Sequence, residues 1–149
     1  MFALTEWQIN CLIDIKCETV EKQSGPFDID ALVVDDEKDI CFLLSGILRK
    51  KKFQAKCVNT LKDAERSLSE LNPALLFLDN KLPDGYGIEH ISKVREKHPY
   101  TKIIVITAND TNLDKERALN AGADYFIGKP FHSETIIYAI DSLLSEYHA

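Results

Sequence analysis

The sequence predicts an α/β fold in which a doubly wound, five-stranded parallel sheet follows an extra N-terminal helix. Stretches with strand-like and helix-like apolar spacing alternate from residue 31 onward. Four of the strand-like runs are almost wholly apolar, as expected of parallel strands buried on both faces. The connections are short, which favours right-handed crossovers between neighbouring parallel strands. The five predicted strands cover residues 31–34, 53–58, 74–78, 103–106 and 125–128.

The second predicted strand differs from the other four. Residues 53–58 alternate mainly between apolar and polar side chains, which is typical of a strand with one face in water. We therefore expect it at an edge of the sheet.

Each predicted strand is followed by a segment with helical apolar spacing. The first helix should span about residues 37–51, and a capping box at Thr60 and Asp63 should begin the second, which Asn72 ends. A third helix should precede His98. The fourth, capped by Thr111 or Asn112, has few apolar side chains to bury, so we expect it to be the most weakly held. The fifth follows Ser133 and has a strong apolar stripe.

Residues 1–26 are predicted to form a helical extension and linker, and residues 27–149 the main domain. Thr5 begins another capping box, and Gln23–Pro26 has the composition of a linker. A lone helix this apolar is marginal in water, so we expect it to dock on its own domain or, preferably, to pair with a second chain as a homodimer. Its apolar stripe consists of Ile9, Leu12, Ile13, Cys17 and Val20.

Composition limits the possible functions. The chain has 149 residues, 45% of them hydrophobic, and a net charge of −6, which fits one globular domain and argues against a nucleic-acid-binding surface. No apolar run approaches the ~18 residues of a membrane span, and no signal peptide is recognisable. We expect a cytoplasmic protein that does not contact membranes.

The four cysteines show no C-x-x-C spacing, and each lies in an apolar-periodic segment. Buried, reduced thiols are therefore expected rather than disulfides or metal ligands. The cysteines are Cys11, Cys17, Cys41 and Cys57.

Polar side chains stand where four predicted strands end: Asp35 and Asp36, Asp79, Thr107 and Lys129. Carboxyl ends of parallel strands meet at one edge of a sheet, where ligands of open α/β folds bind. Clustered carboxylates repel one another, so this edge should bind a hard divalent cation such as Mg²⁺. A hydroxyl and an ammonium group beside the metal could hold a phosphoryl group, and one aspartate could accept it.

Four segments then resemble the receiver domains of two-component response regulators. Each is a weak motif alone, but all four occur in order with family-like separations. They are residues 33–36 (VVDD), 78–87 (LDNKLPDGYG), 106–108 (ITA) and 122–131 (GADYFIGKPF). The resemblance covers residues 31 to 147 and implies the receiver type of the flavodoxin-like fold.

The resemblance also implies a role for each site residue. Asp79 would be the phosphoacceptor. Asp36 and Asp79 would bind Mg²⁺ directly, together with the backbone carbonyl of Lys81, while Asp35 would hold the metal through water. As a switch, the Thr107 hydroxyl would turn toward the phosphoryl group.

Three further features follow from the same resemblance. Lys129 would pair with the phosphoryl group, and the Lys129–Pro130 peptide bond would be cis. Phe126, three residues before the lysine, would change its rotamer as part of the switch. The donor would be a histidine kinase or a histidine phosphotransfer protein, and the output a contact surface for a downstream protein target. Beyond self-phosphorylation and autodephosphorylation, no enzymatic activity is expected.

Several alternatives remain open. A haloacid-dehalogenase-like phosphatase would need a second aspartate where Lys81 stands. In a flavodoxin-like cofactor-binding module, the acidic residues 35–37 would repel the phosphate of the cofactor. The chain could instead be a phosphorylation-independent interaction module. Asp35 or Asp84 could be only a helix cap, and Gly85 and Gly87 could serve only a tight turn. With no residues left after about 148 for an output domain, we expect a stand-alone or terminal receiver.

Overall fold

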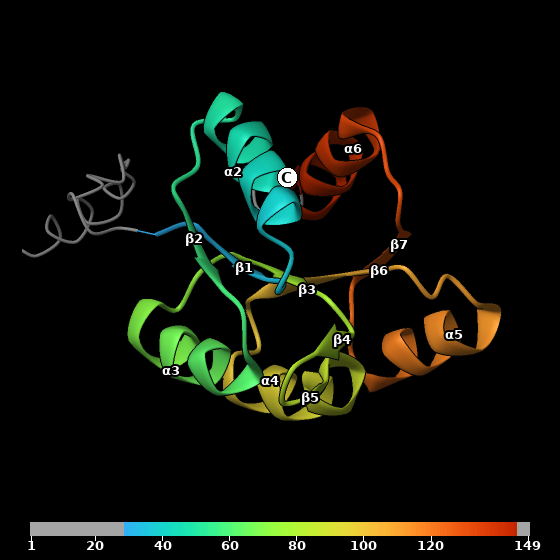
Figure 1. Ribbon diagram of the computed structural model, residues 1–149. Coiled ribbons are helices and arrows are strands. Elements are labelled where there is room, and N and C mark those ends of the chain that lie inside the picture. Colours follow the sequence, from blue (N-terminus) through green and yellow to red (C-terminus); the bar gives the residue numbers. More distant parts are fainter. Residues whose placement is uncertain (1–28, 146–149) are drawn as a thin grey trace, which may run out of the picture.

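The computed structural model describes residues 29–145, which contain one five-stranded parallel sheet (Figure 1). The strand order is β2-β1-β3-β6-β7, so β2 lies at one edge, as its alternating sequence predicts. The strands are β1 (Ala31–Val34), β2 (Ala55–Val58), β3 (Leu75–Leu78), β6 (Lys102–Thr107) and β7 (Tyr125–Gly128).

Helices cover both faces of this sheet, which confirms the doubly wound architecture (Figure 1). One face is covered by α2 (Lys38–Lys50) and α6 (Ser133–Leu144). The other face is covered by α3 (Leu61–Leu71), α4 (Ile91–Lys97) and α5 (Asn112–Ala121).

The hydrophobic core has two parts, one on each face of the sheet. Alternate residues of the strands contribute to the two parts: Val33 and Phe77 face α2 and α6, whereas Leu32 and Leu76 face α3 and α4. These four side chains are at most 1% exposed. Burying a side chain of this kind stabilises the fold by roughly 1.5–3 kcal/mol, so the sheet is a rigid support for groups at its edges.

The helix starts follow the predicted capping chemistry in two places. The Thr60 hydroxyl accepts the backbone N–H of Asp63 (3.1 Å), and the Thr111 hydroxyl accepts that of Asp114 (3.1 Å). The α3 helix has a second cap, because the Asp84 carboxylate accepts the first two N–H groups of the helix, at 2.8 and 3.0 Å. Asp84 is therefore a helix cap.

The α5 helix buries little, as its sequence predicts. Ala118 is its one fully buried residue, whereas Leu113 and Leu119 are 65% and 41% exposed. Because the helix has few apolar contacts, a local rearrangement of it costs little free energy.

The segment after β3 contains structure that the sequence did not predict. A small antiparallel hairpin of β4 (Lys81–Leu82) and β5 (Gly85–Tyr86) leads into the 3₁₀ helix η1 (Gly87–His90). A β-carbon at Gly87 would clash with the carbonyl oxygen of Asp79, so the chain can pass this close to Asp79 only with glycine there.

Arg95 of α4 joins several segments at the amino-terminal edge of the sheet. Its guanidinium donates to the carbonyls of Thr101 (2.7 Å) and Gly122 (3.0 and 3.2 Å), and to the Asp124 carboxylate (2.6 Å). The same Asp124 oxygen accepts the N–H of Ile103 (2.8 Å). The starts of β6 and β7 are thereby fixed to α4.

The predicted N-terminal helix, the domain boundary near residue 26 and the predicted helix pairing lie outside residues 29–145. Among the described residues, no helix is both long enough and apolar enough to span a bilayer.

Candidate functional site

The predicted site residues lie side by side because each is held to the neighbouring strand by its backbone. The N–H of Asp35 donates to the last residue of β2 (3.1 Å), and that of Asp79 to the last residue of β1 (2.9 Å). The N–H of Lys129 donates to the carbonyl of Thr107 (2.9 Å). The sheet therefore places these side chains at its carboxyl edge, as predicted.

Three carboxylates converge at this edge. Asp35, Asp36 and Asp79 each offer an oxygen, and the three oxygens lie within 4.8 Å of one another. Asp35 and Asp79 are buried, at 5% and 6% exposure, whereas Asp36 is exposed. The cluster thus opens to solvent on the side of Asp36.

Lys129 places its ammonium group among the carboxylates. Its Nζ lies 3.0 Å from Asp35 Oδ2, 3.5 Å from Asp79 Oδ2 and 3.0 Å from Glu37 Oε1. Burial by itself would lower the pKa of Lys129, but the bonds to Asp35 and Glu37 outweigh it and raise that pKa. The lysine is therefore a permanent cation in the site.

Asp79 is the carboxylate whose acidity is most altered. Burial, followed by the nearby charge of Asp35, raises the pKa of Asp79 from 3.8 to about 6. The ammonium of Lys129 and the backbone N–H groups of Asn80 and Lys81 partly oppose this increase. Burial and the Asp35 carboxylate together therefore outweigh the effect of the lysine on the pKa of Asp79.

The donor set suits a hard divalent cation. Three carboxylates with mutually close oxygens, one of them exposed, provide the anionic oxygen ligands that Mg²⁺ prefers and leave solvent access for its water ligands. Both carboxylate oxygens of Asp35 already have partners within the protein, since Oδ1 accepts the N–H of Glu37 (2.9 Å) and Oδ2 lies 3.0 Å from the Nζ of Lys129. Lys81 belongs to β4 and is exposed.

Thr107 and Phe126 lie on the neighbouring strands β6 and β7, and Thr107 is the last residue of β6. Thr107 is 2% exposed, and its hydroxyl oxygen accepts the N–H of Asn109 (3.2 Å). Phe126 is half-buried, and its side chain packs against the core between the sheet and α3, α4 and α5. It also lines a surface hollow together with Leu119 and Phe131, so it has space beside it.

Sequence reasoning missed Asn80, which orders the loop after Asp79. Its side-chain oxygen accepts the N–H of Ile88 (2.9 Å) and its carbonyl accepts that of Gly87 (2.7 Å). Asn80 is 7% exposed. A buried asparagine in a loop is commonly a loop-ordering residue, and its position directly after Asp79 was the available signal.

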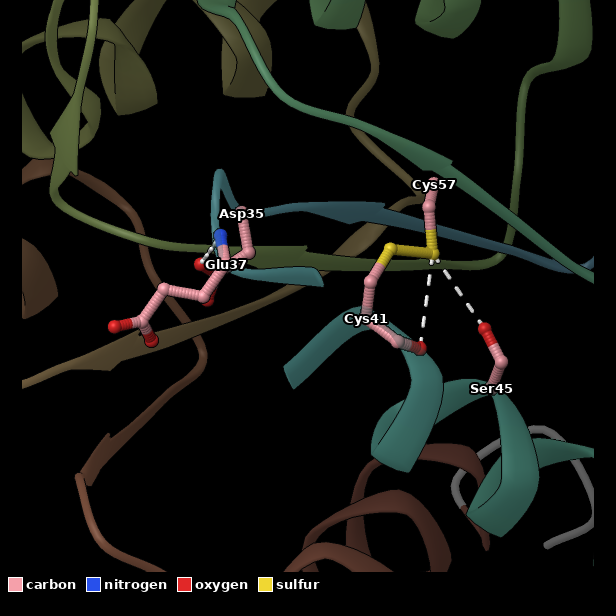
Figure 2. The surroundings of a disulfide bond; sticks show 5 residues. All are labelled: Asp35, Glu37, Cys41, Ser45 and Cys57. Carbon is pink, nitrogen blue, oxygen red and sulfur yellow. Dashed lines mark hydrogen bonds between the residues drawn. A yellow bond between two sulfur atoms is a disulfide. The ribbon is translucent and has the colours of Figure 1, made fainter. Parts of the chain in front are cut away.

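The prediction of reduced cysteines is wrong for two of the four. Cys41 of α2 and Cys57 of β2 form a disulfide, with their Cα atoms 6.1 Å apart (Figure 2). The pairing arises because α2 passes over the edge strand, which no local spacing reveals. Cys11 and Cys17 lie outside the described residues.

The Lys129–Pro130 peptide bond is cis, as the resemblance implied.

Comparison with known proteins agrees with this geometry. The family model of the response regulator receiver domain matches residues 31–141. A CheY-like receiver domain protein from Methanospirillum hungatei has 28% identity and a TM-score of 0.75, over 80% of this chain and 95% of its own. The beryllofluoride-activated NtrC4 receiver domain dimer has 35% identity and a TM-score of 0.75, over 79% of this chain and 98% of its own.

A third similar structure is the BeF3-activated DrrB receiver domain. It is 28% identical, with a TM-score of 0.72, over 79% of this chain and 98% of its own. The matched region contains every strand of the sheet and all the residues at its carboxyl edge. With its five-stranded fold and its carboxylate cluster, the chain belongs to the response regulator receiver domain family.

Proposed function

We propose that Asp79 accepts a phosphoryl group from a phosphohistidine of a kinase or phosphotransfer protein, in a Mg²⁺-dependent reaction. The observation that carries this proposal is the convergence of Asp35, Asp36 and Asp79 around the ammonium of Lys129. Asp36 and Asp79 would hold the metal with the Lys81 carbonyl, and Asp35 through water. The bound metal supplies positive charge to the transferring oxygens.

The transfer itself needs an ionised Asp79. One of its carboxylate oxygens forms a bond to phosphorus while the bond between phosphorus and the imidazole nitrogen breaks, and the histidine leaves. With a pKa of about 6, Asp79 is mainly ionised near neutral pH. Lys129, already 3.5 Å from Asp79, is close enough to follow the charge onto the phosphoryl oxygens.

The switch would use Thr107 and Phe126. The added phosphoryl group carries about −1.5 to −2 charges near pH 7, which the Thr107 hydroxyl and Lys129 can meet by moving toward it. Movement of Thr107 leaves space for Phe126 to turn inward. The weakly buried α5 would then shift its population and change the contact surface offered to a downstream protein.

We also propose domain bounds, a cellular location and a mode of self-association for this chain. We place the receiver domain at residues 27–149, after a helical extension over residues 1–26, and expect the chain to work in the cytoplasm, where phosphohistidine donors are made from ATP. A homodimer through the N-terminal helix would keep two receivers together. One similar structure is described as a receiver domain dimer, which makes self-association reasonable for this family.

Mass spectrometry of the intact chain tests the acceptor assignment. Incubation with Mg²⁺ and acetyl phosphate should add one phosphoryl group, and either EDTA or Asp79→Asn should prevent the addition. Asp84→Asn is the matched control, because it changes an exposed aspartate of the next loop that does not reach the carboxylate cluster. Modification that persists in Asp79→Asn would contradict the assignment.

Beryllofluoride, a phosphoryl mimic, tests the switch. Its complex should move the amide NMR signals across residues 107–131, and an unchanged spectrum there would reject the mechanism.

A chain that binds its target equally well with Asp79→Asn would instead be a phosphorylation-independent interaction module.

A further inference from the structure

The disulfide between Cys41 and Cys57 lies where solvent reaches it. Cys57 is exposed on the edge strand β2, and Cys41 is partly exposed in the first turns of α2. Among residues 29–145, β2 is the outermost strand of the sheet, and no further strand of this part of the chain covers it. A small thiol can therefore approach the Cys57 sulfur from outside.

Both ends of the disulfide are linked to the acidic loop of the site, residues 35–37: Cys41 by a hydrogen bond, and Cys57 through its neighbour Val58. The N–H of Cys41 donates to the carbonyl of Glu37 (3.2 Å), and the carbonyl of Val58, next to Cys57, accepts the N–H of Asp35 (3.1 Å). The backbone N–H of Glu37 donates a hydrogen bond to the Asp35 carboxylate (2.9 Å; Figure 2). The disulfide and these backbone hydrogen bonds thus form a ring that includes residues 35–37.

The same loop contacts the centre of the site. Asp35 and Glu37 each bind the ammonium of Lys129 at 3.0 Å, and Asp36 between them is one of the three clustered carboxylates. A change in the conformational freedom of this loop therefore changes how rigidly the carboxylates of the cation site are held.

We propose that Cys41 and Cys57 form a redox-active pair, reduced by cellular thiols, that sets how firmly the acidic loop holds its cation. The effect on the cation rests on the function proposed above. Cytoplasmic disulfides are uncommon and are mostly transient, catalytic or redox-sensing, so a solvent-accessible one beside a signalling site fits that use.

The reduction consumes two thiols. One thiolate attacks the exposed Cys57 sulfur, forms a mixed disulfide with it and releases the Cys41 thiolate. A second thiolate attacks the sulfur of the mixed disulfide's small thiol and releases the Cys57 thiolate, and each released thiolate takes a proton from water. Two electrons pass to the protein, and the two small thiols leave as one disulfide.

The environment accommodates both redox states. The Cys57 sulfur lies 3.5 Å from the Ser45 hydroxyl and 3.7 Å from the Cys41 carbonyl oxygen. Dashed lines in Figure 2 mark these two contacts. After reduction, the Cys57 thiol can donate to that carbonyl, and the Ser45 hydroxyl can donate to the sulfur. No rearrangement of the fold is required to accept the reduced pair.

The oxidised form should bind Mg²⁺ more tightly. The covalent link restricts the first turns of α2 relative to β2 and thereby holds the residue 35–37 loop in one arrangement, so less conformational entropy is lost on binding. Reduction removes this restriction. We expect the Mg²⁺ dissociation constant to rise roughly five-fold on reduction, at the low end of coupling between distinct sites.

Thiol trapping tests the pair itself. The full chain with Cys11→Ser and Cys17→Ser retains Cys41 and Cys57 as its only cysteines. After equilibration in glutathione buffers of increasing reducing strength, acid quenching and alkylation, mass spectrometry should show zero labels under oxidising conditions and two under reducing ones, reversibly. A chain that stays doubly labelled in oxidised glutathione would overturn the proposal.

Calorimetric titration with Mg²⁺ tests the coupling. The oxidised and reduced forms should differ in affinity, while the same background with Cys41→Ser and Cys57→Ser should match the reduced form under both conditions. Equal affinities of the two redox forms would overturn the coupling, even with normal Asp79 phosphorylation. Redox-dependent Mg²⁺ affinity without any phosphorylation at Asp79 would support the redox pair and reject the phosphoacceptor role.

Discussion

The Lys129 ammonium lies 3.0 Å from a carboxylate oxygen of Asp35, so the last strand of the sheet supplies a cation to the loop after the first. This pair is almost fully enclosed, with side-chain exposures of 12% and 3%. Lys129 thus performs part of the charge neutralisation that the carboxylate cluster requires when no metal is bound.

Lys129→Gln should therefore destabilise the metal-free protein. It leaves the buried charges of Asp35 and Asp79 without their ammonium partner, which we expect to cost about 3–5 kcal/mol of the free energy of unfolding. Added Mg²⁺ should recover more stability in this variant than in the wild type. Urea unfolding with EDTA and with Mg²⁺ measures both effects.

Lys115→Gln is the control, because Lys115 is exposed on α5. Equal unfolding midpoints for the two variants in EDTA would contradict the neutralising role of Lys129.

The acidity of Asp79 predicts a pH dependence. Its folded pKa of about 6 lies above the ordinary 3.8, so between these values the folded protein holds more protons than the unfolded chain. Stability therefore falls as pH rises through this window and stays lower above it. Without metal, Asp79→Asn should be more stable than the wild type by roughly 1–2 kcal/mol near pH 7, after allowance for solvent screening.

This advantage should shrink as the pH falls from 6 toward 4, where folded Asp79 is protonated and the carboxyl of the unfolded chain approaches its ordinary pKa of 3.8. Thermal unfolding in EDTA across that range gives the comparison, and a constant difference between the two proteins would show that the charge of Asp79 is not responsible.

Asp36→Ala should weaken Mg²⁺ binding without unfolding the domain. Asp36 is exposed, so its removal creates no cavity, and the loss of one clustered carboxylate reduces repulsion in the metal-free state. We expect at least roughly a ten-fold loss of affinity in calorimetry, in line with losing a charged metal ligand. Asp39→Ala, an exposed change in the first turn of α2, should retain wild-type affinity.

Two glycines should respond in opposite directions to the same substitution. Gly87→Ala would press a methyl group against the Asp79 carbonyl and the Leu78 side chain, and should lower the free energy of unfolding by about 1–3 kcal/mol. Gly46→Ala meets no atom within 4 Å in the middle of α2, and should raise it by about 0.5–1 kcal/mol. Denaturant unfolding of both variants tests this; similar shifts would contradict it.

Deletion of residues 1–26 should convert a dimer into a monomer, because the proposed pairing depends on the apolar stripe of the N-terminal helix. Light scattering measures the mass of both chains, and Asp79 phosphorylation should be unchanged in the shorter one. A full-length chain that is monomeric at high concentration would leave only intramolecular docking of the helix.

Much of the fold was predictable because the apolar residues of its strands and helices recur at clearly different spacings. The apolar runs ending at Val34 and Leu78 occur as fully buried strands, and the caps at Thr60 and Thr111 lie where hydroxyl residues precede helical stripes. The carboxylate cluster followed from topology, since parallel strands end at a common edge. The common edge therefore required only that the strands be parallel, whereas the contacts within the site, such as that between Glu37 and Lys129, did not follow from the sequence.

The missed features depend on contacts between segments distant in sequence. The Cys41–Cys57 disulfide exists only because α2 crosses an edge strand, and Glu37 binds Lys129 only because β1 and β7 open onto one edge. The β4–β5 hairpin is too short to show a period. Asp84 was recognised as a candidate cap, but its target, the start of α3, precedes it in the chain.

The Arg95 hydrogen bonds have a mechanical consequence for signalling. They hold the starts of β6 and β7 and the end of α5 to α4, far from the carboxylates. A strand fixed at one end transmits a push at its other end as a pivot rather than as a slide. Charge added beside Asp79 should therefore move the loops that follow β6 and β7, together with the first turns of α5, while the end of α5 stays anchored to α4.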